Sequence, residues 1–109
     1  MRNKDLSLPQ NPTLKDFHDY VRKLEKIRGF EKENILEKCL MLGEEVGEIF
    51  KSVRKHVGIK IDANSEVLDI SDEIADVFIF LLSIANRYDI NIEDAFRRKE
   101  EKNKKRIWS

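Results

Sequence analysis

The chain has 109 residues, and its 21 basic and 21 acidic side chains balance to a formal net charge of zero. This balance excludes a global electrostatic field that would draw the protein to nucleic acid or to an anionic membrane surface. The length is that of one domain, and so short a chain buries a smaller fraction of its surface than a long one. We therefore expect one domain over residues 1–109, with a core that self-association extends.

The single cysteine and the hydropathy pattern bear on the compartment. Cys39 cannot form an internal disulfide, and its place in an apolar-periodic stretch predicts a small buried side chain. Residues 1–12 hold charges and both prolines but no apolar run, and the longest apolar run, near 77–82, is too short to span a bilayer. These features indicate a cytoplasmic protein in a reducing environment.

The composition and the apolar periodicity predict an all-α fold, because glycine and proline are rare and good helix formers dominate. After Asn11 and Pro12, Thr13 is a suitable N-cap for a first helix that continues to Gly29. A second helix is predicted from about residue 32 to Gly58. Its apolar residues recur at steps of three and four: Ile35, Cys39, Leu42, Val46, Ile49 and Val53.

The second half of the chain predicts two more helices. Residues 58–65 provide turn chemistry and an N-cap for a third helix over about 66–88, whose apolar residues cover most of its circumference. Asn91 with Asp94 opens a fourth, mostly polar helix that continues to about Ile107. The third helix should be the core, and it offers more apolar surface than its neighbours in a short chain can cover. We therefore expect the four helices to pack as an oligomeric helical bundle.

Two of the predicted helices carry acid pairs inside otherwise apolar stretches. Glu45 and Glu48 in the second helix are spaced i, i+3, which places them within about 60° of each other on one face. Glu73 and Asp76 repeat this spacing in the third helix. Solvated acids are the commoner explanation of such pairs, but Phe80 projects beside the second pair. A face that combines acids with a large apolar side chain is expected to pack against something.

The acids lack cationic neighbours that would neutralise them within their helices. The i, i+4 positions after Glu45, Glu73 and Asp76 are apolar. Semi-buried carboxylates without cations repel and take up protons unless a divalent cation lies among them. Oxygen ligands suit Mg²⁺, with Mn²⁺ as a substitute, and not Zn²⁺. A di-iron bundle is a weaker alternative, because Glu-x-x-His motifs are absent and His18 and His56 are expected at the surface or at helix ends.

Three motifs follow one another in a recognisable order. Residues 43–49 (Gly-Glu-Glu-Val-Gly-Glu-Ile) precede Arg54 and Lys55, residues 72–77 (Asp-Glu-Ile-Ala-Asp-Val) precede an apolar run, and residues 91–95 (Asn-Ile-Glu-Asp-Ala) lead to Lys99, Asn103 and Arg106. This order, over about residues 14–107, resembles that of the MazG-like and dCTP-pyrophosphatase-like families of all-α nucleoside triphosphate pyrophosphohydrolases.

The resemblance implies Mg²⁺-dependent hydrolysis of (deoxy)nucleoside triphosphates to a monophosphate and pyrophosphate, in a role that cleans the nucleotide pool. It implies a homodimer or homotetramer, and it implies these metal ligands: Glu45, Glu48, Glu73 and Asp76. Glu44 would be a supporting acid that orients water, so that Glu44 and Glu45 are the expected catalytic acids. The chemistry is consistent with this, because phosphoanhydride hydrolysis needs charge neutralisation and an in-line water, without a covalent intermediate.

Residues 97–106 form a cationic segment with seven basic side chains and two acids. Most of these cations are expected to be solvated and to interact favourably with the negative, C-terminal end of the helix dipole. Lys99, Asn103 and Arg106 share one stripe of the predicted helix, where they could bind the phosphates of the substrate. Lysine-rich helices also bind nucleic acid, but the zero net charge and the lack of a recognised nucleic-acid module weigh against that function.

The base-binding residues are harder to identify. Members that resemble the dCTP branch carry tryptophans near the second helix, where this chain has Phe30 and the basic segment 51–56. Phe17, Tyr20 and Phe30 are candidates for stacking on a base, with Phe30 the expected substrate contact, although aromatic residues at helical spacing are more often core residues. The main rival to an enzyme is a non-enzymatic nucleotide- or metal-binding helical regulatory module.

Overall fold

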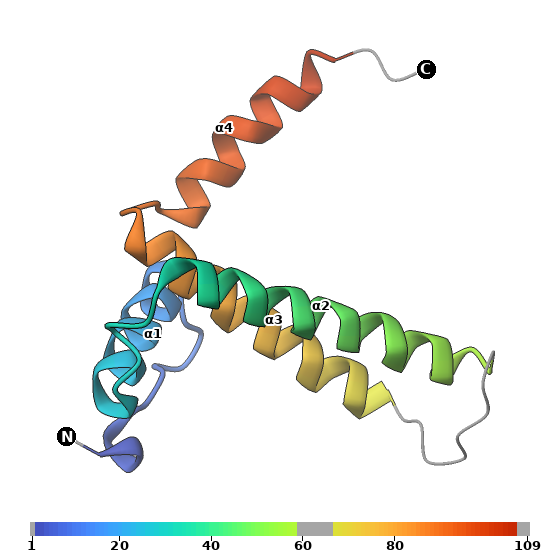
Figure 1. The fold of residues 1–109 in the computed structure, drawn as a ribbon. Coiled ribbons are helices and arrows are strands. Elements are labelled where there is room, and N and C mark those ends of the chain that lie inside the picture. The colour runs from blue at the N-terminus through green and yellow to red at the C-terminus, as the bar shows by residue number, and fades with distance from the viewer. Residues whose placement is uncertain (1, 59–66, 107–109) are drawn as a thin grey trace. The chain divides into compact units, whose positions relative to one another are not determined.

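The computed structural model describes residues 2–58 and 67–106, and the regular secondary structure in these residues is entirely helical (Figure 1). A short 3-10 helix, η1, precedes four α-helices: η1 (Asn3–Asp5), α1 (Leu14–Arg28), α2 (Ile35–His56), α3 (Val67–Arg87) and α4 (Ile92–Lys104). The predicted all-α fold with four helices is confirmed. The chain divides into two compact units, one of Met1–Glu31 with Ala85–Ser109 and one of Lys32–Ile84.

Helices α1, α2 and α4 begin at side chains that cap their first turn. The Thr13 hydroxyl accepts a hydrogen bond from the Asp16 backbone N–H at 3.2 Å, and the Asp16 carboxylate accepts one from the Thr13 N–H at 2.8 Å. This reciprocal capping box satisfies two backbone donors that the helix itself cannot pair. At the other end of α1, Gly29 adopts φ +76°, a left-handed conformation that glycine tolerates better than other residues.

Two other boundaries differ slightly from the prediction. Helix α2 begins at Ile35 and not near residue 32, because the Asn34 side chain accepts a hydrogen bond from the Leu36 N–H at 2.7 Å. Helix α4 ends at Lys104, where the Lys105 N–H bonds back to the Lys102 carbonyl at 3.2 Å and tightens the last turn. The predicted N-cap of the third helix within 58–65 falls almost wholly outside the described residues.

A buried histidine, His18, connects the helices of the first unit through hydrogen bonds. Its Nε2 accepts a hydrogen bond from the Ile92 backbone N–H at 3.1 Å, so Nδ1 carries the proton and donates to Asn86 Oδ1 at 2.7 Å. Asn86 Nδ2 in turn donates to the carbonyl of His18 at 3.1 Å. The prediction that His18 lies at the surface was therefore wrong: it is 4% exposed, because both ring nitrogens find partners inside the unit. His56 does end α2 and is exposed, as predicted.

An ion pair adds to the hydrogen bonds of the first unit. Arg87 Nη2 lies 2.9 Å from Glu25 Oε2, and both side chains are largely buried. The same guanidinium group donates to the Phe30 carbonyl at 3.0 Å. Arg87 therefore links the end of α3 to the end of α1 and to the residue after its glycine cap. Val21 and Ala85 are buried in this unit, with 2% and 6% exposure.

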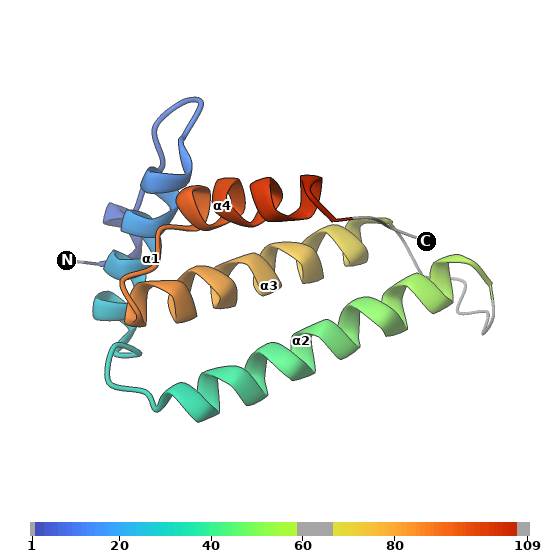
Figure 2. The ribbon, with the colours of Figure 1, turned by 90° about the horizontal axis from the view of Figure 1, so that it is seen from above.

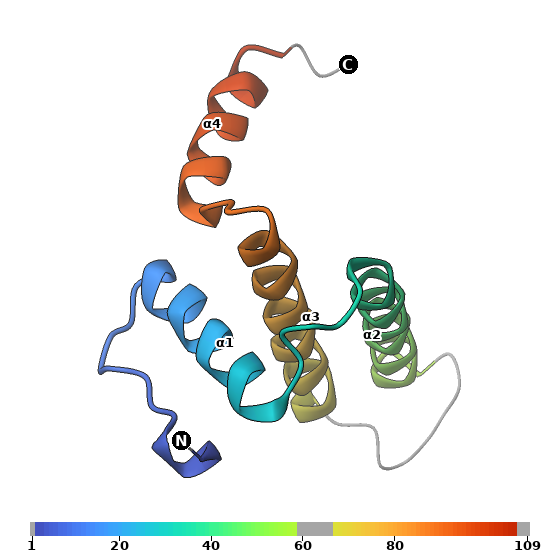
Figure 3. The same ribbon diagram turned by 60° about the vertical axis from the view of Figure 1, so that its left-hand side comes forward.

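The second unit is a helical hairpin in which α2 and α3 run side by side in opposite directions (Figures 1, 2 and 3). The ammonium group of Lys38, on α2, lies 5.6 Å from the centre of the Phe80 ring, on α3. Leu82 is 1% exposed, as predicted for a core helix. Ile74 and Leu81 on the same helix are nevertheless exposed, because two helices cannot enclose each other's full circumference.

Cys39 corrects another expectation from the sequence. It is a free, exposed cysteine and not a buried one. Its position at the edge of the outer side of α2 explains this, since α3 does not cover that side. No helix in the described part of the chain is both long and apolar enough to cross a bilayer.

Candidate metal centre

Three acidic side chains from the two helices of the hairpin converge. Glu45 projects from α2, and Glu73 and Asp76 project from α3, one helical turn apart. One carboxylate oxygen from each residue lies within 4.8 Å of the other two. Glu45 and Glu73 are half-buried, whereas Asp76 is exposed. The antiparallel hairpin thus joins the two acid motifs that the sequence places 28 positions apart, from Glu45 to Glu73.

The negative charges of the cluster affect the titration of one of its members, Glu73. The pKa of Glu73 is raised above its ordinary value, first by a hydrogen bond with Glu45, then by desolvation and by the negative charges around it. Within the described residues, none of the three clustered carboxylates forms an ion pair with a lysine or arginine. A cation among the three carboxylates would relieve the repulsion that raises this pKa.

The donor set fits a hard divalent cation. Carboxylate oxygens are the ligands that Mg²⁺, Mn²⁺ and Ca²⁺ prefer, and the cluster offers neither thiolate nor imidazole. His18 has both ring nitrogens occupied within the first unit, so it cannot serve as an additional ligand without losing those bonds. Mg²⁺ keeps several positions for water or phosphate when a protein supplies only a few carboxylates. Three carboxylates are consistent with such an open site.

The two remaining acids of the α2 motif lie outside this group of three. Glu48 is exposed and is not among the carboxylates within 4.8 Å of one another, although its charge contributes to the raised pKa of Glu73. Glu44 is also exposed, and it lies about 100° around the helix from Glu45. The structure therefore brings together Glu45, Glu73 and Asp76 of the predicted ligands, with Glu48 close enough to act through its charge.

The buried lysine of α2 was missed in the sequence analysis. Lys38 lies two turns before Glu45 on the same side of α2, and its side chain is only 4% exposed. Its ammonium group lies 3.4 Å from a carboxylate oxygen of Glu33 and faces the Phe80 ring. The spacing of seven residues between Lys38 and Glu45 was the available signal. Lys38 places a positive charge on the acid-bearing side of this helix.

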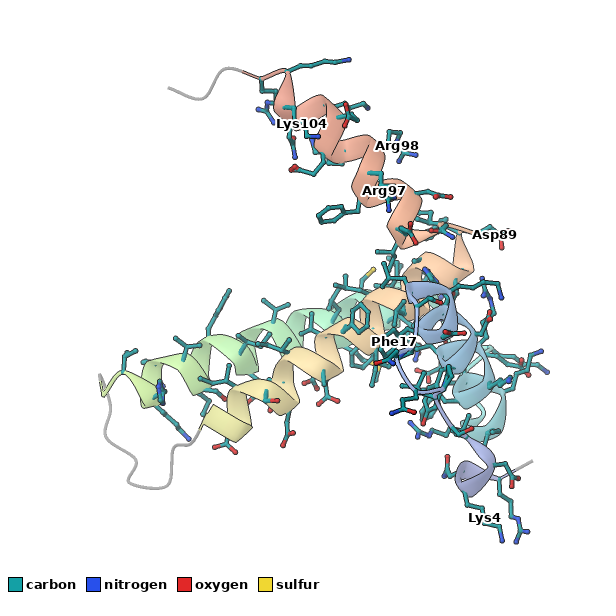
Figure 4. The ribbon with its side chains drawn as sticks, turned by 180° about the vertical axis from the view of Figure 1, so that it is seen from behind. Lys4, Phe17, Asp89, Arg97, Arg98 and Lys104 are labelled. Carbon is teal, nitrogen blue, oxygen red and sulfur yellow. The ribbon has the colours of Figure 1, made fainter. Side chains whose placement is uncertain are left out.

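Of the predicted phosphate-binding residues, Lys99 and Asn103 lie on α4 in the first unit, whereas Arg106 lies two residues beyond its end, so the predicted helical stripe is not continuous. Lys99 and Arg106 are exposed, and Asn103 is half-buried, with a long contact of 3.5 Å to Glu100 Oε1. Figure 4 shows the neighbouring cations Arg97, Arg98 and Lys104 projecting from the same helix. Some of these cations are neutralised locally: Arg97 pairs with Glu93 at 3.1 Å and Lys104 with Glu101 at 3.2 Å.

A hollow of about 710 Å³ lies beside α4 in the first unit. Its lining residues are Leu14, Ile92, Glu93, Phe96, Arg97, Glu100, Glu101 and Lys104. Three acids against two bases make a poor binding surface for a triphosphate, and none of the three predicted phosphate-binding residues lines it. The predicted base contact, Phe30, is 40% exposed and lies just after α1.

Comparison with known proteins agrees with the acid motifs. A family model described as the MazG nucleotide pyrophosphohydrolase domain matches residues 32–107, more than two thirds of the chain. The match contains all of α2, α3 and α4, and therefore the whole acidic cluster. Helix α1 precedes the matched region. A search of curated proteins finds no match.

Proposed function

The chain belongs to the MazG nucleotide pyrophosphohydrolase family, and on that premise we propose that it is a Mg²⁺-dependent enzyme that hydrolyses nucleoside triphosphates to a monophosphate and pyrophosphate. The observation that carries the proposal is the convergence of Glu45, Glu73 and Asp76 within 4.8 Å, from two helices that both lie in the matched region. Ribonucleotides and deoxyribonucleotides are both candidate substrates.

The acidic residues would divide the work between holding the cation and preparing water. Glu45, Glu73 and Asp76, with Glu48 as a fourth ligand, would hold Mg²⁺. When bound, Mg²⁺ supplies charge neutralisation for the phosphate oxygens and lowers the pKa of a coordinated water. The carboxylates of Glu44 and Glu45 would orient the attacking water and accept its proton. This arrangement needs no covalent intermediate.

The substrate itself would be bound by residues outside the cluster. Lys99 and Asn103 of α4, with Arg106 beyond its end, are proposed to hold the phosphates, because two cations and one amide provide charge-assisted and neutral hydrogen bonds. Phe30 is proposed to stack on the base, for which its exposed ring is suitable. We propose a role in removing unwanted nucleotides from the cytoplasmic pool, and assembly as a homodimer or homotetramer.

The reaction can be tested with purified protein and a panel of nucleoside triphosphates. Mg²⁺ is supplied in one series and withheld by EDTA in a second, and the products are separated so that pyrophosphate is distinguished from orthophosphate. Pyrophosphate and monophosphate in equal amounts, formed only with the metal, are expected. Release of orthophosphate would indicate cleavage of the terminal bond and contradict the proposed reaction.

The same preparation distinguishes the enzyme from a regulatory module. A module would bind Mg²⁺ or a nucleotide, and calorimetry would register that binding, but no triphosphate in the panel would be consumed. Restoring EDTA-treated protein with Mn²⁺ in place of Mg²⁺ is expected to restore turnover, since both ions accept carboxylate ligands.

A further inference from the structure

The side of α2 that bears Glu45 continues past the acidic cluster to a buried lysine. Lys38 precedes Glu45 by seven residues, so the two side chains lie within about 20° of each other around the helix and about 10 Å apart along its axis. Phe80 follows Glu73 by the same seven residues on α3. Because α2 and α3 run in opposite directions, both steps lead from the cluster toward the same end of the hairpin (Figure 2).

Lys38 and Phe80 meet at that end. The ammonium group of Lys38 lies 5.6 Å from the centre of the Phe80 ring, and the lysine side chain is only 4% exposed. Met41, one turn before Glu45, is exposed, and Phe80 is half-buried. This end of the hairpin therefore offers apolar surface around one buried cation. Small-molecule sites have this composition, with mostly apolar contacts and a few placed polar groups.

The two directions along the hairpin differ in polarity. Beyond the cluster in the other direction, the acid-bearing side of α2 carries the polar residues Ser52 and His56. A triphosphate whose α-phosphate lies at the cluster extends both ways, with the ribose and base on one side and the remaining phosphates on the other. A flat base is suited to apolar contacts and phosphates are suited to polar ones. The end with Lys38 and Phe80 is therefore the side suited to the base.

Glu33 makes Lys38 one half of a donor and acceptor pair. A carboxylate oxygen of Glu33 lies 3.4 Å from Lys38 Nζ, and the Glu33 side chain is 24% exposed. An ammonium group only donates hydrogen bonds, and a carboxylate only accepts them. Charge-assisted bonds are usually about 2.7 to 2.9 Å long, so this pair is loosely closed. A donor and an acceptor thus lie side by side at the apolar end, with the acceptor nearer to solvent.

Stability alone explains this pair poorly. A buried ion pair adds little to stability when it is compared with apolar side chains of similar size. A methionine at position 38 would pack against Phe80 without the cost of removing an ammonium group from water. Recognition of a ligand gives the buried charge a use that packing does not.

We propose that Lys38 and Glu33 recognise the base of the substrate and select bases in which an oxygen adjoins a ring N–H: guanine, hypoxanthine, uracil and thymine. The Lys38 ammonium donates to the oxygen, and the Glu33 carboxylate accepts from the neighbouring N–H. Adenine and cytosine present an amino group beside an unprotonated ring nitrogen, so both contacts become mismatched. The inference rests on the proposed function, because it names the base of the triphosphate that the acidic cluster would cleave.

The preference follows from the burial of the lysine. A site that is built to hydrogen-bond a ligand strongly rejects an analogue with the wrong pattern, since its buried polar groups are then left mismatched. Water does not readily relieve an amino group that faces the 4% exposed Lys38 side chain. The matching bases should therefore bind at least about tenfold more tightly than the mismatched bases.

Calorimetry with the nucleoside monophosphates, in the presence of Mg²⁺, measures base recognition without hydrolysis. GMP is compared with AMP and UMP with CMP, so that each pair has bases of equal size. The unaltered protein is expected to bind GMP and UMP at least about tenfold more tightly than their partners. Equal affinity within either pair, or no measurable binding of any of the four, overturns the proposal.

A lysine-to-methionine change assigns the preference to Lys38. Lys38→Met removes the donor and keeps an apolar stem against Phe80, so the ratio of AMP to GMP dissociation constants should fall to within about threefold of unity. Lys32→Met makes the same change at an exposed lysine next to Glu33 and should leave the ratio unaltered. A merely structural ion pair would change stability and not the ratio, so an unchanged ratio in Lys38→Met overturns the proposal.

Changes to the base provide a test that misfolding of a variant cannot imitate. The monophosphate of 2,6-diaminopurine riboside has the size of GMP, but an amino group replaces the oxygen and the adjacent ring nitrogen carries no proton. It is expected to bind as weakly as AMP. IMP retains the oxygen and the N–H and should bind at least about tenfold more tightly than AMP. Binding of the diaminopurine nucleotide as tightly as GMP overturns the proposed recognition.

Hydrolysis rates separate this inference from the proposed function. Pyrophosphate release from GTP, ATP, UTP and CTP at equal kcat/KM would contradict the base recognition and leave the proposed reaction in place. A preference for GMP and UMP in binding, with none of the four triphosphates cleaved, would contradict the proposed reaction and leave the base recognition in place. A higher kcat/KM for GTP and UTP that Lys38→Met abolishes is the result expected.

Discussion

The burial of His18 is determined by its hydrogen-bond partners and not by the polarity of its own side chain. The sequence shows a histidine on an otherwise amphipathic helix, which favours a surface position. The structure buries it because Asn86 and the Ile92 backbone N–H lie where its two nitrogens point. These partners are 68 and 74 positions away, so no local pattern could predict them. The ring also accepts from one of the backbone donors that the start of α4 leaves unpaired.

We expect His18→Ala to destabilise the protein by about 2 to 4 kcal/mol, since it leaves a cavity and unpaired buried groups. Asn86→Ala should be destabilising for the same reason. Chemical denaturation of both single variants and of the double variant measures the coupling. The double variant is predicted to lose clearly less than the sum of the two, and strict additivity would show that the two side chains act independently.

Changes at Glu73 should affect both the proposed metal binding and the stability of the folded protein. In EDTA at neutral pH, Glu73→Gln is expected to stabilise the protein, because it removes one of three crowded negative charges. The raised pKa means that the folded protein holds this proton more firmly than the unfolded chain does. The advantage of the variant should therefore shrink as the pH falls through the raised pKa toward the ordinary value of 4.5.

Excess Mg²⁺ should reverse the order of the two proteins. A ligand that binds only the folded state raises its stability according to concentration and affinity, and the variant has lost a ligand. Thermal unfolding with EDTA and with Mg²⁺, at matched pH, makes the comparison. If the variant is the less stable protein in EDTA at neutral pH, the carboxylates do not repel as described. Because solvent reaches the Glu73 carboxylate and screens its charge, only the direction of these changes is predicted.

At the scale of elements, the helices and their order follow from short-range rules. Rare glycine and proline, the Thr13 and Asn91 caps and the apolar periodicity predicted four helices, and the structure confirms them. The predicted start of α2 was too early because the periodicity extends into residues 32–34, where the Asn34 side chain turns out to cap the helix. Periodicity cannot distinguish the last residues before a cap from the first residues after it.

Asn91 offers a direct test of a predicted cap. Its side-chain oxygen accepts a hydrogen bond from the Asp94 N–H at 3.0 Å. Asn91→Ala should therefore cost about 1 kcal/mol of unfolding free energy, whereas Asn91→Ser, which retains an acceptor, should cost a few tenths. Urea denaturation followed by circular dichroism measures both. Equal effects of alanine and serine would show that the cap contributes nothing to stability.

The spacing of the acid motifs predicted which acids share a helix face, but not which of them form the cluster. The i, i+3 spacing identified which acids share a helix face, and the hairpin brought Glu45, Glu73 and Asp76 together as expected. Spacing alone made Glu48 as strong a candidate ligand as Glu45, Glu73 and Asp76. Spacing does not show the side-chain direction, which leaves Glu48 outside the group of three. The burial of Lys38 was missed because a lysine at the surface and a lysine buried against an aromatic ring are identical in sequence.

At the level of the whole molecule, the described residues expose many large apolar side chains, among them Leu36, Leu40 and Phe50. The fold class and the family followed from the sequence, but the exposed side of α2 did not, because the apolar periodicity of α2 is similar on its inner and outer sides. Cys39 was predicted to be buried for this reason and is exposed.

The proposed reaction depends on the carboxylate cluster, which would support cleavage of a triphosphate to pyrophosphate. The most direct measurement is the rate of pyrophosphate release, at saturating Mg²⁺, by Asp76→Asn and by Asp72→Asn. The two changes remove the same charge from exposed positions one turn apart on α3, but only Asp76 belongs to the cluster. We expect at least a hundredfold loss of rate for Asp76→Asn and a rate within about threefold of the unaltered protein for Asp72→Asn. Full activity of a folded Asp76→Asn variant would contradict it.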